Sequence, residues 1–221
     1  MSRELRSLPR SVAERVAGHL AAATRLVEDD PAAAYDRALE ARHQAPRVGM
    51  IREACGIAAY HAGFWAEALA ELRAARRITG SDVYLPLIAD CERGLGRPER
   101  ALAAVREVRT EALDPATRVE LRIVESGARR DLGQHDAAVV ALQVPELRAR
   151  AVRPWSARLF YVYADALLDA GRESEALEWF SRAATADDEG ETDAGERVAE
   201  LEGVVVVDVE HQGDVERPHG P

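Results

Sequence analysis

The sequence predicts an all-α fold, a solenoid of about five antiparallel helix pairs, followed by an acidic C-terminal tail with one short extended segment. Three observations support this prediction. Alanine, leucine, arginine and glutamate, all good helix formers, dominate the 221 residues, and aromatic residues account for only 5%. A short phrase of residues recurs along the chain at a nearly constant spacing. The excess of acidic residues is confined to one end.

The recurring phrase places a glycine after one helix and opens the next helix with Glu-Ala-Leu or a similar run. Its four glycines are Gly63, Gly96, Gly133 and Gly171. An earlier copy lacks the glycine, and the alanines of all five copies are Ala34, Ala68, Ala101, Ala138 and Ala176, spaced by 34, 33, 37 and 38 residues. Because glycine readily adopts the left-handed conformation that ends a helix, each phrase predicts a helix–turn–helix corner.

Other residues mark where helices begin. Ser11 and Glu14 have the spacing of a capping box. Asp30 precedes a proline, as does Asp114, and each pair predicts an N-cap followed by a first-turn proline. With the glycine corners, these signals predict helices that begin near residues 12, 31, 49, 65, 82, 98, 115, 135, 155 and 173.

The helix pairs resemble the tetratricopeptide repeat (TPR) family, which has a small residue in its first helix and two more in its second. The fifth pair matches well, with Phe160, Tyr163, Gly171 and Phe180 in the expected places. The small residues of the five repeats are Ala22, Ala34 and Ala41; Gly56, Ala68 and Ala75; Ala89 and Ala101; Ser126 and Ala138; and Ala164, Ala176 and Ala183. The resemblance implies a right-handed superhelical solenoid.

The pattern is less regular in the third and fourth repeats. Val108 occupies the place of a small residue, and Pro145 is expected to end a helix near Gln143 and to begin a short extra turn. The predicted organisation is a basic N-terminal arm (residues 1–10), TPR-like repeats (11–186) and an acidic, partly disordered tail (187–221). The five repeats are assigned to residues 11–48, 49–81, 82–114, 115–153 and 154–186.

The net charge of −10 is unevenly distributed along the chain. Residues 1–186 contain 27 acidic residues and 27 arginines, whereas residues 187–221 contain 12 acidic residues and two arginines. The repeats should therefore exert no long-range attraction on nucleic acid. The sequence contains no lysine, so all 29 of these positively charged residues are arginines.

The sequence gives no sign of catalysis or of a bound cofactor. The six histidines form no pair at metal-ligand spacing, and Cys55 and Cys91 are expected to pack as small apolar side chains. The glycines are explained as helix corners, and neither a phosphate-binding loop nor a nucleophile elbow is present. We therefore expect no enzyme activity, no catalytic or metal-binding residue and no cofactor. The N-terminus lacks a secretory signal and no apolar run is long enough to cross a membrane, which predicts a cytoplasmic protein.

In the family that the chain resembles, the first helices of successive repeats line a concave groove that contacts a peptide. Projected onto this sequence, the groove has aromatic, acidic and basic members. The candidate partner-binding residues are His19, Glu53, Tyr60, His61, Asp90, Arg93, Arg130, Tyr161 and Asp165. The predicted function is a non-catalytic scaffold or adaptor that binds a peptide segment of a cytoplasmic protein. The sequence does not identify the partner, the oligomeric state or the biological process.

Two further hypotheses follow from the sequence. An alternative function is RNA binding by a ridge of arginines, namely Arg73, Arg76, Arg77, Arg93, Arg97 and Arg100. In the tail, residues 204–209 have the β-branched composition of a strand, and a lone strand must pair, pack or wait for a partner. We expect this segment to pack on the last helix pair or in the groove, with the acidic residues of the tail near arginines. A solvated, disordered tail is the alternative.

Overall fold

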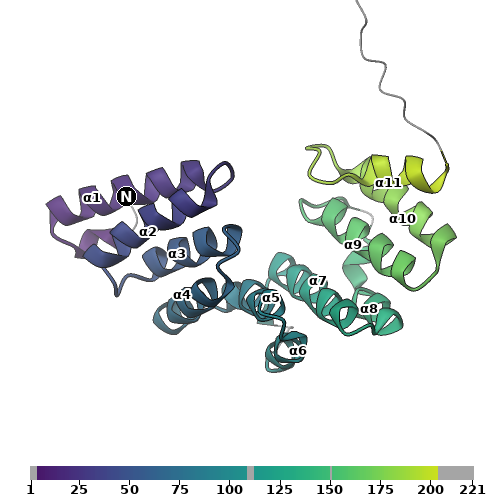
Figure 1. The fold of residues 1–221 in the computed structure, drawn as a ribbon, viewed down its shortest axis with the longest axis horizontal. Helices are drawn as coiled ribbons and strands as arrows, with labels where there is room; N and C mark the ends of the chain where they lie inside the picture. The colour runs from purple at the N-terminus through teal and green to yellow at the C-terminus, as the bar shows by residue number, and fades with distance from the viewer. Residues whose placement is uncertain (1–3, 109–111, 150, 204–221) are drawn as a thin grey trace, which may run out of the picture.

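The computed structural model describes residues 4–108, 112–149 and 151–203, and every regular element within these ranges is a helix. The chain forms an open arch that runs from α1 (Arg10–Leu26) to α11 (Ala194–Leu201) (Figure 1). Between them lie α2 (Pro31–Gln44), α3 (Gly49–His61), α4 (Trp65–Thr79), α5 (Leu85–Gly94), α6 (Pro98–Arg106), α7 (Pro115–Asp131), α8 (His135–Ala141), α9 (Ser156–Asp169) and α10 (Glu173–Ala186). The predicted all-α solenoid of five helix pairs is confirmed.

Each helix packs mainly on its neighbours in the chain. The two helices of a pair contact one another, and the second helix of each pair also packs on the first helix of the next pair. The helices α3, α5, α7 and α9 face the inside of the arch, and α4, α6, α8 and α10 lie on its outside (Figure 1). A helix pair cannot bury its apolar stripe alone, so the core is shared along the array.

The corners between paired helices have the predicted conformation. Gly63, Gly96, Gly133 and Gly171 all have φ values between 69° and 72°, in the left-handed region that glycine adopts without strain. The predicted N-caps also form: the Asp30 carboxylate accepts a hydrogen bond from the amide of Ala33, and Asp114 accepts one from Thr117.

The helix starts agree with the predicted positions to within three residues. The capping box at Ser11 is wrong, however, because α1 begins at Arg10 and Pro9 is its N-cap residue, with no side-chain capping bond. The carboxylate of Glu14 instead accepts a hydrogen bond of 2.8 Å from Arg10 Nε. A helix that starts two residues earlier than predicted places Ser11 inside the first turn, where its hydroxyl cannot cap it.

Small residues allow the helices to approach closely. The alanines of the five repeated phrases are completely buried: Ala34, Ala68, Ala101, Ala138 and Ala176. Gly56 on α3 faces Leu72 on α4, and a Cβ placed on Gly56 would lie 2.6 Å from Leu72 Cγ. These positions therefore set the distance between paired helices.

The irregular fourth repeat is also observed. Helix α8 ends at Ala141, and Pro145 opens a short 3-10 helix, Pro145–Arg148. The lost backbone donor of proline and its fixed φ prevent α8 from continuing. The predicted break before Pro145 is confirmed.

Both ends of the array include residues from outside the predicted repeats. Leu5 is buried against the first helix pair, and the Glu4 carboxylate accepts a hydrogen bond from the Met50 amide at the start of α3. At the other end, α11 packs on α10 and was not predicted. The segment at residues 204–209 lies outside the described residues.

Candidate partner-binding groove

The inner helices carry a row of ion pairs that links successive repeats. The Tyr60 hydroxyl on α3 donates a hydrogen bond to Asp90 on α5. Arg93, one turn further along α5, donates to Asp90 Oδ1 at 2.7 Å and to both carboxylate oxygens of Asp131 on α7, at 2.7 and 3.1 Å. Burial and the hydrogen bond to Asp90 raise the pKa of Tyr60, so its hydroxyl remains a donor at neutral pH.

The row of ion pairs passes close to Gly127 on α7. A Cβ on Gly127 would lie 2.4 Å from Arg93 Cζ. Because the residue here has no side chain, the Arg93 guanidinium can lie against the α7 backbone on its way to Asp131. The glycine thus makes room for the pairing between α5 and α7.

The same row continues from α7 to α9 and α11. Arg130 Nε donates to Asp169 Oδ2 at 2.6 Å, and Arg130 Nη1 lies 3.4 Å from Asp165 Oδ2. Asp165 also lies 3.8 Å from Arg197 on α11. Burial raises the pKa of Asp165, although both arginines oppose the shift. The two cations therefore offset part of the cost of burying this carboxylate.

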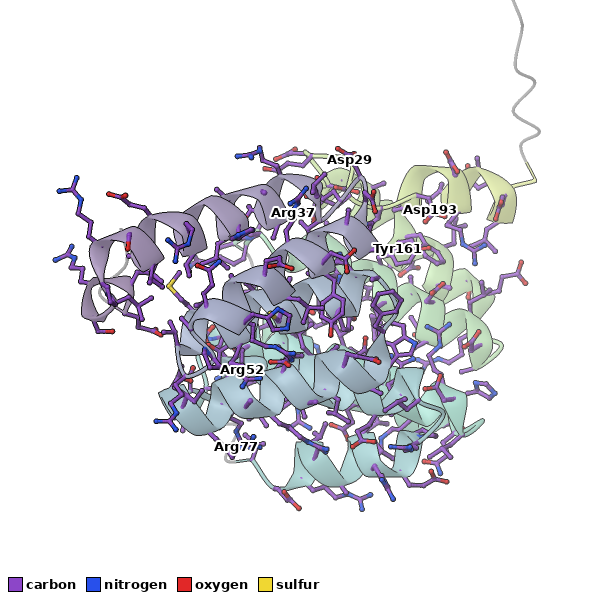
Figure 2. All side chains as sticks on the ribbon, turned by 60° about the vertical axis from the view of Figure 1, so that its left-hand side comes forward. Asp29, Arg37, Arg52, Arg77, Tyr161 and Asp193 are labelled. Carbon is purple, nitrogen blue, oxygen red and sulfur yellow. The ribbon has the colours of Figure 1, made fainter. Side chains whose placement is uncertain are left out.

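A second layer of side chains lies on α7 and α9. Arg158 Nε lies 3.4 Å from Glu120 Oε2, and the Arg158 side chain is 55% exposed. Burial raises the pKa of Glu120, and Arg158 opposes that shift. Tyr161 lies beside Asp193, which precedes α11 (Figure 2), and burial together with the hydrogen bond to Asp193 raises the pKa of the Tyr161 hydroxyl.

An open apolar pocket lies between α1 and α3. It has a volume of about 390 Å³, and Glu53 is the one charged side chain among the residues that line it. Glu53 Oε2 accepts a hydrogen bond of 3.1 Å from the hydroxyl of Tyr84. The lining residues are Ala23, Thr24, Val27, Met50, Glu53, Ala54, Ile57 and Ala58.

Comparison with known proteins identifies the fold. No protein-family model matches the sequence, and no curated protein matches it. The structure is similar to the crystal structure of TTC0263, a thermophilic TPR protein of Thermus thermophilus, with a TM-score of 0.64 and 17% identity. The match covers 84% of this chain and 98% of that one. The chain has the TPR fold. The expected resemblance is thereby confirmed at the level of the fold.

Most of the predicted groove residues belong to the interactions described above. Glu53 lines the apolar pocket of the TPR array, and the row of ion pairs contains Tyr60, Asp90, Arg93, Arg130 and Asp165. Their contacts with one another were not predicted. The spacing of the repeats indicates on which side of a helix a residue lies, but it does not indicate which side chain that residue contacts.

Two predicted residues belong neither to the row nor to the apolar pocket or the second layer. His61 is exposed at the end of α3, where its ring lies 5.9 Å from that of Tyr60. His19 is partly buried on α1 and is not part of the lining of the apolar pocket. The two histidines therefore do not join a common site with the charged residues.

Sequence reasoning missed several residues of the inner face, namely Met50, Glu120, Arg158, Asp169 and Arg197. A signal for three of them was present. Met50, Glu120 and Arg158 each lie six residues before the small residue in the first helix of their TPR repeat. Asp169 and Arg197 carry no comparable signal, and Arg197 belongs to a helix that was not predicted.

The groove has no arrangement that indicates catalysis or metal binding. Within residues 4–108, 112–149 and 151–203, no cluster of His, Cys, Asp and Glu side chains is arranged to hold a metal ion. Cys55 and Cys91 are fully buried, and burial raises the pKa of each thiol to about 12. In the same ranges, no helix is both long and apolar enough to span a bilayer.

Proposed function

We propose that this protein is a non-catalytic scaffold or adaptor that binds a peptide segment of a cytoplasmic partner protein in the concave groove of its TPR array. The observation that carries the proposal is the open apolar pocket between α1 and α3, on the first helices of two successive repeats. Such a pocket can hold one side chain of a peptide, while neighbouring polar groups hydrogen-bond its backbone.

The inner face supplies suitable polar groups further along the arch. Arg158, Tyr161 and Val162 line a second depression together with the loop that precedes α11. The Arg158 side chain is half exposed, and within the described part of the chain its ion pair is a long one with Glu120, so it can turn toward a ligand at little cost. A peptide that spans both depressions would contact the inner face across the opening of the arch.

The ion pairs of four of the six arginines in the predicted ridge argue against the alternative of RNA binding. Arg73 and Arg97 both pair with Glu92, Arg76 pairs with Asp82, and Arg93 pairs with Asp90 and Asp131. A phosphate would have to displace these carboxylates to gain the same contacts. The peptide hypothesis requires no such exchange, and for this reason we favour it over RNA.

A site-specific photo-crosslinker tests the proposal. We would place p-benzoylphenylalanine at Val162 in the groove and, as a control, at Val140, which is 64% exposed on α8 outside the arch. Each protein is irradiated in cytoplasmic extract of the source organism, with and without RNase, and adducts are identified by mass spectrometry. We expect an RNase-resistant polypeptide adduct from Val162 alone. RNase-sensitive adducts, or equal adducts from both positions, would contradict the proposal.

A further inference from the structure

We propose that the partner segment is a basic amphipathic peptide, with a large aliphatic side chain in the α1–α3 pocket and Lys or Arg side chains toward the acidic edges of the arch. This inference rests on the proposed function and adds the chemistry of the partner. Three features of the described residues carry it: the composition of the pocket, the pairing of the inner arginines and the charge of two turns that border the opening.

The pocket is built for an aliphatic side chain next to a cation. Met50, Ile57 and Val27 give it apolar walls, and its volume of about 390 Å³ accommodates a Leu, Ile or Met side chain with adjoining backbone. The carboxylate of Glu53 lies in this lining without a basic residue beside it among the lining residues. A Lys or Arg close to the anchoring residue of the peptide would supply the missing positive charge.

Three arginines of the inner face already have acidic partners. Arg93 and Arg130 each pair with two aspartates, and Arg197 pairs with Asp165 and Glu200. An acidic ligand would compete with these carboxylates, and Arg158 is the inner-face arginine with the weakest pairing, at 3.4 Å from Glu120. Positive charge on the ligand meets no such competition.

Two turns give the opening of the arch an acidic border. The turn between α1 and α2 and the loop between α10 and α11 lie on either side of that opening (Figure 1). Every charged residue in the two segments is acidic: Glu28, Asp29 and Asp30 in the first, and Asp187, Asp188, Glu189, Glu191 and Asp193 in the second. Arg153 lines a pocket together with the second loop but does not balance its charge. The border therefore attracts cations and repels anions.

The chain's own C-terminal segment is a poorer occupant by the same criterion. Residues 204–221 include the apolar valines but carry four acidic residues and one arginine. Their net negative charge would face both acidic turns. A separate basic partner has the complementary charge, and we therefore choose it over the tail.

Selection from a random 12-residue phage-displayed peptide library on the immobilised full chain tests the inference. We expect enriched peptides to combine a large aliphatic residue with net positive charge. The variants Ile57→Glu and Thr24→Arg should each weaken binding of the best synthetic peptide at least tenfold, and Val140→Glu on α8 should leave it unchanged. Thr24 is exposed, so its variant keeps the test valid if Ile57→Glu fails to fold, which circular dichroism would reveal.

The acidic border is tested with the same peptide. Neutralising Glu28, Asp29, Glu189 and Glu191 to the corresponding amides should weaken binding about tenfold in low salt and flatten its dependence on ionic strength. Acidic consensus peptides, peptides that resemble residues 204–209, no enrichment, or binding that the pocket and border variants leave unchanged would each overturn the inference. A groove-specific adduct from Val162 would still uphold the proposed function in those cases.

Discussion

The two cysteines are buried thiols with a definite chemical consequence. Cys55 and Cys91 have no exposed surface, and burial raises the pKa of each from 9.0 to about 12. The thiolate is the reactive form, so both side chains should be inert in the folded protein at neutral pH. We expect a water-soluble disulfide reagent such as DTNB to label neither thiol until denaturant unfolds the chain. Labelling of the native protein at the rate of a free thiol would contradict this burial.

The same thiols predict a loss of stability in alkali. Since their folded pKa is raised, their contribution is complete below pH 9 and decreases as the pH rises from 9 toward 12, where the unfolded chain alone ionises. In this range the free energy of unfolding should fall by up to about 1.4 kcal/mol per pH unit for each thiol. Urea unfolding at pH 8, 9, 10 and 11 measures it, and a Cys55→Ala, Cys91→Ala double variant should show a shallower decline.

Two glycines inside helices should respond oppositely to the same substitution. Gly56→Ala places a methyl group against Leu72 and should reduce the free energy of unfolding by about 1–3 kcal/mol. Gly18 on α1 has no atom within 4 Å of the added Cβ, so Gly18→Ala should increase it by about 0.5–1 kcal/mol. Urea denaturation of both variants gives the comparison. Equal effects would mean that helix propensity, rather than helix separation, decides at Gly56.

At this scale the sequence predicts positions better than interactions. Asp90 and Arg93 could be assigned to the inner face because the repeat spacing fixes which side of a helix is inward. The contacts of Arg93 with Asp90 and Asp131 could not be predicted. Which carboxylates a flexible arginine reaches depends on the relative tilt of the two helices. The close passage of Arg93 over Gly127 depends on the same tilt.

Among the elements, α11 closes the apolar end of the array. Its Val198 and Leu201 pack on the cluster that contains Phe180, and the Arg197 guanidinium lies 5.4 Å from the Phe180 ring centre. A chain that ends at residue 186 should expose this face, lose several kcal/mol of stability and self-associate. Thermal unfolding and light scattering would show both effects. A chain that ends at residue 203 keeps α11 and is the matched control against which both effects are measured.

The sequence contained a weak signal for α11 that its composition concealed. Ala194, Val198 and Leu201 recur at helical spacing, but acidic residues and glycines surround them and favour the interpretation of a solvated tail. Eight residues are too few to form a stable helix alone, so packing on α10 decides whether α11 forms. Corners and caps are local, which explains why the other helix starts could be predicted so closely.

For the whole molecule, stability should be lowest in the middle of the arch. The outer helices α6 and α8 have nine and seven residues, compared with 15 in α4 and 14 in α10. Shorter helices have fewer backbone hydrogen bonds and a smaller apolar face; α8 buries only Ala138 and Val139. In an array whose units contact only their neighbours, such a deficit remains local.

Native-state hydrogen–deuterium exchange should therefore find the fastest helical amides in α6 and α8. Amides of α4 and α10 should exchange more slowly, and α7, which has 17 residues and packs on both α6 and α8, serves as an internal reference within the same region. Equal protection in α8 and α4 would show that the array unfolds as one cooperative unit. Helices α6 and α8 lie in the middle of the arch, between the two acidic turns. If they open first, the separation of these turns can adjust around a peptide.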